Sequence, residues 1–390
     1  MRDPRLTVRP ATMTLFFPGL RGRPNAALGA TITLLLLLLV LPFIVGSTVG
    51  GNAGVRALAF AALYVMLALG LNIVVGFAGL LDLGYIAFYA VGAYMYALLA
   101  SPHLTSNFPA LAAMFPTGFH SSIWMVVPLA AALAAFFGVV LGAPVLKLRG
   151  DYLAIVTLGF GEIIRIFLTN LNAPLNFTNG PQGITLIDPI RIVGINFGRT
   201  LDLGFMKIGS VYLYYYLFLL LTIITIVICI RLQDSRLGRA WMAIREDDIA
   251  AKAMGINVRN VKLLAFALGA TFGGVSGAMF AAFQGFVSPE SFSLTESIIV
   301  LAMIVLGGLG HIPGVVLGAV LLALFPEVLR HTVVPVQMQL FGKVLVDAEV
   351  LRMLLYGLAM VLVMLYRPKG LWPAPEHGIA RAPRPATKGA

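Results

Sequence analysis

Long runs of apolar residues separated by short polar segments dominate the sequence. A run of about 20 apolar residues can cross the roughly 30 Å hydrocarbon core of a bilayer as a helix. The pattern therefore predicts an all-α polytopic membrane protein of about ten transmembrane helices, some of them short or broken, with eight to ten compatible with the pattern. The runs cover residues 27–46, 57–77, 83–100, 123–146, 152–170, 211–230, 263–286, 297–329 and 350–366.

The run 297–329 differs from the others because it is long for one span and short for two. Its only ionisable residues are His311 and Glu327, and its centre reads GGLGHIPG over residues 307–314. Glycine and proline at this density disfavour a regular helix. We therefore expect two short or broken helices here, which gives the chain an even number of spans.

Composition agrees with a membrane protein. Of the 390 residues, 59% are hydrophobic and 11% charged, whereas a soluble domain is about 45–50% apolar and about 25% charged. The mean hydropathy is +0.95. This composition excludes a nucleic-acid-binding protein, despite a net charge of +11.

The positions of Lys and Arg predict the topology, because these residues accumulate in cytoplasmic segments. With the N-terminus inside and ten spans, the inside segments 1–26, 147–151, 231–262 and 367–390 hold 19 Lys and Arg residues, and the outside segments hold 7. Both termini are therefore expected in the cytoplasm. The predicted organisation is a cytoplasmic tail (1–26), a transmembrane domain (27–366) with an outside loop at 171–210, and a second cytoplasmic tail (367–390).

Motifs for enzymatic chemistry are scarce. The sequence lacks a G-x-x-x-x-G-K-[ST] phosphate-binding loop and a Cys/His metal cluster, so neither a cofactor nor a metal is expected in this chain. Gly274-Val275-Ser276-Gly277 is similar to the nucleophile motif of rhomboid proteases, but a nucleophilic serine needs a nearby histidine base. The better interpretation is a packing stripe of small residues, spaced every four positions, at Gly269, Gly273 and Gly277.

The inside segment 231–262 is the longest charged stretch between spans. Residues Ala240–Met254 are compatible with one helix, and Gly255 is a plausible helix stop. Two interpretations remain open, a solvated loop and a short helix that docks into a groove of a partner. The residues that would make such a contact are Arg245, Glu246, Asp247, Asp248, Ala250, Ala251 and Gly255.

This segment resembles the coupling loop of ABC importer permeases, whose pattern is Glu-Ala-Ala, three residues, then Gly. Ala250, Ala251 and Gly255 match the pattern, whereas Ile249 stands in place of the Glu and the acid lies one position earlier at Asp248. Further segments resemble the larger of the two permease types of branched-chain amino acid ABC transporters. They are Leu148–Arg165, Asn179–Ile184, Ala243–Phe266, Gly285–Phe292 and Val305–Gly314.

The resemblance implies a subunit without an ATPase site of its own, in a bacterial inner-membrane importer for branched-chain or related amino acids. The implied partners are a second, related permease subunit, two cytoplasmic ATPases that hold ATP and Mg²⁺, and a periplasmic amino-acid-binding protein. Lipid surrounds the assembly and no nucleic acid is involved. The alternative function is a stand-alone secondary transporter driven by an ion gradient.

Ionisable residues within the membrane are candidates for function. Glu162 and Arg165 are three residues apart on one helix face and can pair, either structurally or beside a polar pathway. Asp82 lies in a Gly-rich stretch and is expected to cap the following helix. Glu290 and Glu296 flank an outside loop and are expected in solvent or against the binding protein. The pathway candidates are Asp82, Glu162, Arg165, Gly308 and Gly310, the glycines because interrupted helices mark transport pathways.

Overall fold

The computed structural model describes residues 24–48, 51–115, 118–146, 148, 150–192, 194–202, 207–341, 347–368 and 370–372. Within these ranges, seven helices are long and apolar enough to cross a membrane, and three more apolar helices are shorter. The long helices are α2 (Pro24–Thr48), α3 (Asn52–Asn72), α7 (Ile123–Val145), α8 (Asp151–Asn170), α9 (Ser210–Gln233), α12 (Val258–Gln284) and α14 (Ile312–Phe341), and the shorter ones are α4 (Ile86–Leu99), α13 (Leu294–Gly307) and α15 (Ala348–Tyr366). The all-α membrane fold is thereby confirmed, and almost all of the two predicted tails lies outside the described residues.

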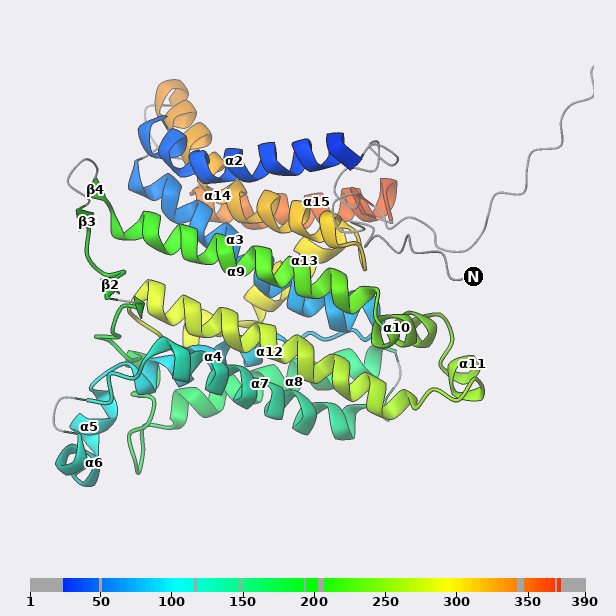
Figure 1. Cartoon of the computed structure of the whole chain (residues 1–390), viewed down its shortest axis with the longest axis horizontal. Helices are drawn as coiled ribbons and strands as arrows, with labels where there is room; N and C mark the ends of the chain where they lie inside the picture. The colour runs from blue at the N-terminus through cyan, green and yellow to red at the C-terminus, as the bar shows by residue number, and fades with distance from the viewer. Residues whose placement is uncertain are drawn as a thin grey trace, which may run out of the picture.

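The helices run side by side along the long axis of the molecule (Figure 1). One end carries α5 (His103–Asn107), α6 (Pro109–Met114) and two antiparallel strand pairs, and the other carries α10 (Arg236–Glu246) and α11 (Asp248–Ala253). The first turn of α2 and the last turn of α15 lie at the α10/α11 end. The strands are β1 (Arg191–Ile192) with β2 (Ile195–Asn196), and β3 (Leu201–Asp202) with β4 (Lys207–Ile208).

Helix α12 lies at the centre and packs against α3, α4 and α7. Close approach depends on its glycines. A Cβ atom on Gly269 would lie 2.6 Å from Cγ2 of Val74, and one on Gly277 would collide with the carbonyl oxygen of Tyr89. One on Gly273 would lie 3.1 Å from Cβ of Phe88. The three glycines therefore form a smooth face on which α3 and α4 rest.

The predicted interruption of the 297–329 run is confirmed, but the second helix, α14, is not short, since it has 30 residues and continues to Phe341. Helix α13 ends at Gly307 and α14 begins at Ile312. Gly308 and Gly310 have φ angles of 127° and 78°, which favour glycine. Pro313 lies in the first turn of α14, where its missing N–H group costs little. The break is thus narrower than the whole Gly/Pro-rich stretch.

Two loops fold back between the helices instead of staying at the ends. Residues 78–85 connect the π-helical turn η2 (Ile73–Phe77), which continues α3, to α4. Residues 285–293 connect α12 to α13 and contain the 3₁₀ turn η4 (Pro289–Phe292). Asp82 in the first loop and Phe292 in the second are both buried. The hydroxyl of Ser297, in the first turn of α13, accepts a 3.2 Å hydrogen bond from Ile86 N–H at the start of α4.

Candidate functional site

The segment between α9 and α12 forms two short helices fixed to the transmembrane helices. Ser235 caps α10 by accepting a 3.2 Å hydrogen bond from Gly238 N–H. Trp241 is completely buried, and its indole Nε1 donates to the carbonyl oxygen of Val261 at 2.7 Å. Since α12 begins at Val258, this bond anchors α10 to the base of α12.

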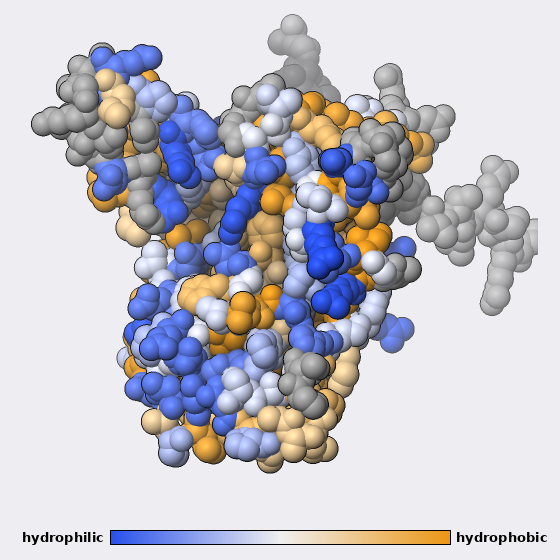
Figure 2. Space-filling model, turned by 90° about the vertical axis from the view of Figure 1, so that its left-hand side faces the viewer, coloured by the Kyte–Doolittle hydropathy of each residue, from blue (hydrophilic) through white to orange (hydrophobic). Residues whose placement is uncertain are grey.

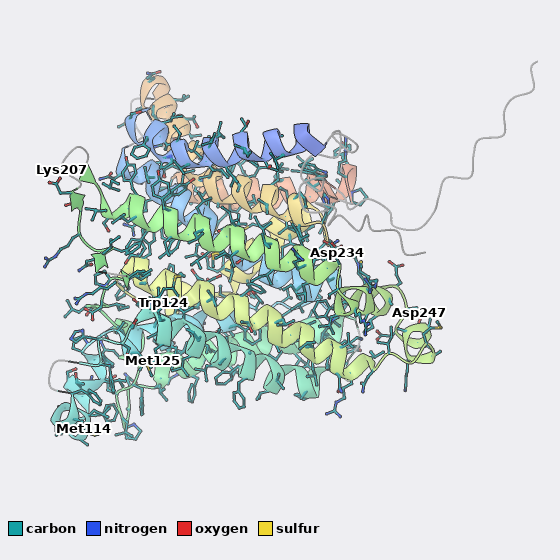
Figure 3. All side chains as sticks on the ribbon, in the orientation of Figure 1. Met114, Trp124, Met125, Lys207, Asp234 and Asp247 are labelled. Atoms are coloured by element: carbon teal, nitrogen blue, oxygen red, sulfur yellow. The ribbon has the colours of Figure 1, made fainter. Side chains whose placement is uncertain are left out.

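The single helix expected over Ala240–Met254 is wrong, because the chain breaks at Asp247. Its backbone is extended, with φ −157° and ψ 112°. Its Oδ1 atom accepts hydrogen bonds from the N–H groups of Ile249 at 2.8 Å and Ala250 at 3.0 Å, so Asp247 caps α11. These two bonds lower the pKa of the Asp247 carboxyl. Asp247 and α11 lie at the far tip of this end of the molecule (Figure 3).

Helix α11 ends where the sequence predicts. Gly255 has a φ of 85°. Its N–H donates to the carbonyl oxygen of Lys252 at 3.1 Å, and Ile256 N–H donates to the carbonyl oxygen of Ala251 at 3.1 Å. This is the hydrogen-bond pattern of a Schellman motif, which favours glycine at the position after the cap. The motif turns the chain sharply from α11 toward α12.

The surface of this tip is more apolar than its sequence suggests. The side chains of Ile249 and Met254 are 69% and 84% exposed. Ala250 is also exposed, whereas Ala251 is buried. A groove of about 1020 Å³ runs beside α11, and its lining includes Ile249 and Lys252. An apolar tip beside a groove suits docking to another protein.

Two of the four consecutive charged residues are held within the chain. Asp248 pairs with Lys262 on α12, with Oδ2 and Nζ 2.5 Å apart. Arg245 is exposed as a whole, but its Nη1 donates to the carbonyl oxygen of Gly76 at 2.6 Å. Glu246 and Asp247 remain exposed. The sequence indicated a charged contact surface here, but it did not reveal that two of these charges hold the segment in place.

Gly76 belongs to a junction where three interrupted elements meet. Asn72, at the end of α3, accepts a 3.0 Å hydrogen bond through Oδ1 from Gly310 N–H in the break between α13 and α14. A Cβ atom on Gly76 would lie 2.7 Å from that same nitrogen. A Cβ atom on Gly310 would lie 2.8 Å from Nη1 of Arg245. The last turn of α10 therefore touches both η2 and the α13–α14 break.

The intramembrane candidates do not converge on one site. Asp82 is 1% exposed, and its Oδ1 accepts from Gly84 N–H at 2.9 Å. Helix α4 has no side-chain cap, so the expected capping by Asp82 is wrong, and the residue instead closes the turn before the helix. Glu162 and Arg165 do pair, with Arg165 Nε 3.0 Å from each carboxylate oxygen. They lie partly exposed on the outer face of α8.

Glu290 and Glu296 differ in their surroundings. Glu290 is exposed, as expected. Glu296 lies in the first turn of α13 and is half-buried. Its Oε2 accepts a 3.0 Å hydrogen bond from the hydroxyl of Tyr64 on α3. Glu296 is therefore only partly solvated, and its contact with the binding protein stays a prediction.

Comparison with known proteins identifies the family. A family model described as branched-chain amino acid transport system / permease component matches residues 53–364. The chain belongs to this family of permease components. The permease is 41% identical over 354 residues to the high-affinity branched-chain amino acid transport system permease protein LivM of Escherichia coli (strain K12), a match that covers 88% of this chain and 74% of the relative.

Two more distant relatives widen the comparison. A probable branched-chain amino acid transport permease protein LivM of Methanocaldococcus jannaschii is 24% identical over 336 residues, which cover 80% of this permease and 90% of the relative. The permease protein LivH of Escherichia coli (strain K12) is 24% identical over 268 residues, covering 67% and 80% of the two chains. No solved structure matches the permease.

Proposed function

We propose that this permease is one of two transmembrane subunits of an ABC importer that moves branched-chain amino acids into the cell. The observation that carries the proposal is the 41% identity over 88% of the chain to a permease protein named for high-affinity branched-chain amino acid transport. The more distant similarity to LivH supports a second, related permease as the other subunit. A periplasmic binding protein would deliver the substrate, and two ATPases holding ATP and Mg²⁺ would drive the cycle.

The α10/α11 end is the proposed cytoplasmic side of the inner membrane. The first turn of α2 and the last turn of α15 lie at this end (Figure 1), which supports the expectation that both termini are cytoplasmic. The segment 231–262, which includes α10 and α11, is rich in Lys and Arg. These residues favour the cytoplasmic side of the membrane. In this orientation the ATPases meet the exposed Ile249 and Met254.

The outer face of α8 is the proposed contact with the second permease. Its exposed residues Ile155, Ile163 and Phe167 are apolar, but the Glu162–Arg165 pair lies on the same helix and is partly exposed. A charged pair is costly against lipid, and intramembrane charges face protein or water-filled cavities in nearly all membrane proteins. A related subunit would cover this face and would shield the pair from lipid.

The proposed mechanism is alternating access. Closure of the ATPases pushes on α11, and Trp241 and the Asp248–Lys262 pair make the segment move with the base of α12. Arg245 transmits the movement to Gly76 in η2 and to the adjoining break at Gly310. Interrupted helices bend at such points more readily than regular ones. The helices that meet there, α3, α13 and α14, then shift against one another, and α3 slides along the small-residue face of α12.

Purification of the permease from its native membrane in mild detergent tests the assembly. The proposal predicts that a second permease and P-loop ATPases co-purify, and that the ATPases are lost when Arg245–Asp248 are all replaced by Ala. An ion-driven carrier would instead purify as a stable lone chain, and an ion gradient would drive its uptake of leucine into liposomes. That outcome would overturn the importer proposal.

A further inference from the structure

A cavity of about 500 Å³ lies between α3, α12, α13, α14 and α15. Arg56 and Gln284 line it near the start of α3 and the end of α12, so it opens toward the end opposite α10 and α11. Figure 2 views the molecule from that end, where hydrophilic residues surround hollows with hydrophobic residues inside. The volume is within the range of about 300–1000 Å³ typical of small-molecule sites.

Arg56 is held in place at the mouth of the cavity. Its Nη2 donates to Oε1 of Gln284 at 2.7 Å. Its guanidinium carbon lies 5.7 Å from the ring centre of Phe60 and 5.5 Å from that of Phe283. Two aromatic rings and an amide therefore orient a positive charge at the entrance.

The interior contains a carboxylate and a second guanidinium. Glu296 lines the cavity from the first turn of α13 and accepts its hydrogen bond from Tyr64, which lines the cavity from α3. Arg352 on α15 also lines the cavity. Glu327 and Arg330 of α14 add a second charge of each sign to the lining. Apolar side chains also line the cavity, among them Ile86 on α4 and Ile299 and Met303 on α13.

An amino acid zwitterion complements such a cavity. Its ammonium group pairs with a negatively charged hydrogen-bond acceptor, and its carboxylate pairs with guanidinium donors. Its branched aliphatic side chain packs against apolar walls. Hydrogen bonds between charged partners are roughly twice as strong as neutral ones. Charged side chains of both signs at membrane depth are retained for function more often than for packing.

We propose that this cavity is a binding site for an aliphatic amino acid on its way through the permease. Glu296, with Tyr64, receives the ammonium group, Arg352 and Arg56 receive the carboxylate, and the aliphatic side chain lies against Ile86, Ile299 and Met303. This assignment rests on the proposed function, because it takes the substrate class from the importer. It adds a selective site within the membrane subunit, separate from the periplasmic binding protein.

The test is binding of radiolabelled L-leucine to the complete complex of permeases and ATPases in nanodiscs, without the binding protein. Competition by 4-methylpentanoate, which lacks the ammonium group, and by isoamylamine, which lacks the carboxylate, identifies the contacts. Glu296→Gln is expected to weaken leucine binding about tenfold or more and to remove the preference for leucine over 4-methylpentanoate. Arg352→Gln is expected to remove the preference for leucine over isoamylamine. Glu290→Gln, an exposed acid six residues from Glu296, is the matched control and should bind as wild type.

Wild-type affinity and unchanged competition in Glu296→Gln would overturn the site. If that variant fails to assemble, Tyr64→Phe takes its place, with a severalfold loss of affinity expected and an unchanged affinity contradicting the proposal. ATP-driven leucine uptake by the wild-type complex with its binding protein separates the two hypotheses. A complex that takes up leucine but binds none at up to about 10 mM without the binding protein refutes the site alone. A complex without uptake refutes the importer function.

Discussion

The Nη1 atom of Arg245 lies 2.6 Å from the carbonyl oxygen of Gly76, a residue 169 positions earlier in the chain. This hydrogen bond joins the exposed α10–α11 segment to the π-helical end of α3. A Cβ atom on Gly310 would lie 2.8 Å from this Nη1 atom and 3.0 Å from the Gly76 oxygen, so the guanidinium lies beside two interrupted elements. Removing the Arg245 side chain should therefore uncouple movement of the ATPases from movement of the transmembrane helices.

Replacement of Arg245 by alanine is expected to uncouple the permease. ATP hydrolysis by the reconstituted importer should continue, while leucine uptake per ATP should fall about tenfold, since a charged hydrogen bond contributes about 1.5–3 kcal/mol. Arg245→Lys should retain part of the coupling because it keeps one charged donor. Arg239→Ala, which removes an exposed arginine of the same helix, is the control. Equal uptake per ATP in Arg245→Ala and Arg239→Ala would show that the bond transmits nothing.

The exposed side chains of Ile249 and Met254 are expected to be the apolar anchors for the ATPase. Ile249→Asp should reduce recovery of ATPase with the purified permease by tenfold or more, because a buried anchor contributes about 2 kcal/mol or more at an interface. Met254→Asp should act in the same direction. Ile195→Asp makes the same change on an exposed isoleucine in β2, at the opposite end of the molecule. Normal ATPase recovery in both α11 variants would place the docking surface elsewhere.

Gly277→Ala tests the packing of α12 against α4. The new methyl group would meet the carbonyl oxygen of Tyr89 and the backbone nitrogen of Ala93, so the helices must separate. We expect a loss of about 1–3 kcal/mol, observed as a lower unfolding temperature of the detergent-solubilised permease. Gly159→Ala on α8 is the matched control, because no atom lies within 4 Å of its added Cβ. A similar unfolding temperature for the two variants would contradict the close approach.

The cap at Asp247 predicts a direction of pH dependence. Hydrogen bonds from Ala250 and Ile249 lower the carboxyl pKa in the folded state, so the cap stabilises α11 above the unfolded pKa of about 3.9. That stabilisation is lost as the pH falls through the lowered folded value. The ¹³C signal of the Asp247 carboxyl should therefore titrate with a midpoint below about 3.9. Asp247→Asn should keep the cap but lose this titration. A midpoint at or above about 3.9 for the wild-type carboxyl would contradict the cap.

Much of the fold follows from apolar run length alone. The break in the 297–329 run was predictable because glycine and proline carry a backbone signal that neighbours do not override. The break at Asp247 was not predictable. An acidic residue in a charged run can lie within a helix or can cap the start of the next helix, and the local sequence does not distinguish the two. The hydrogen bond from Tyr64 to Glu296 was not predictable either, since the two residues are 232 positions apart in the chain.

The contacts that connect the parts are the least predictable from sequence. Asn72 is a polar residue within an apolar run, which is a signal for a buried hydrogen bond, but its partner at Gly310 is 238 residues away. Arg245 looked like one more surface charge beside Glu246. Only the packing of α10 against η2 gives its side chain a carbonyl acceptor in the protein.

ATP-driven accumulation of leucine in liposomes distinguishes an ABC importer from an ion-driven carrier. The liposomes would contain the purified permease with its second permease and ATPases, and the binding protein would be added outside. We predict uptake that requires ATP and persists when ion gradients are collapsed, and that is lost when Arg245–Asp248 are replaced by Ala. Uptake that continues without ATP while an ion gradient is present would contradict it.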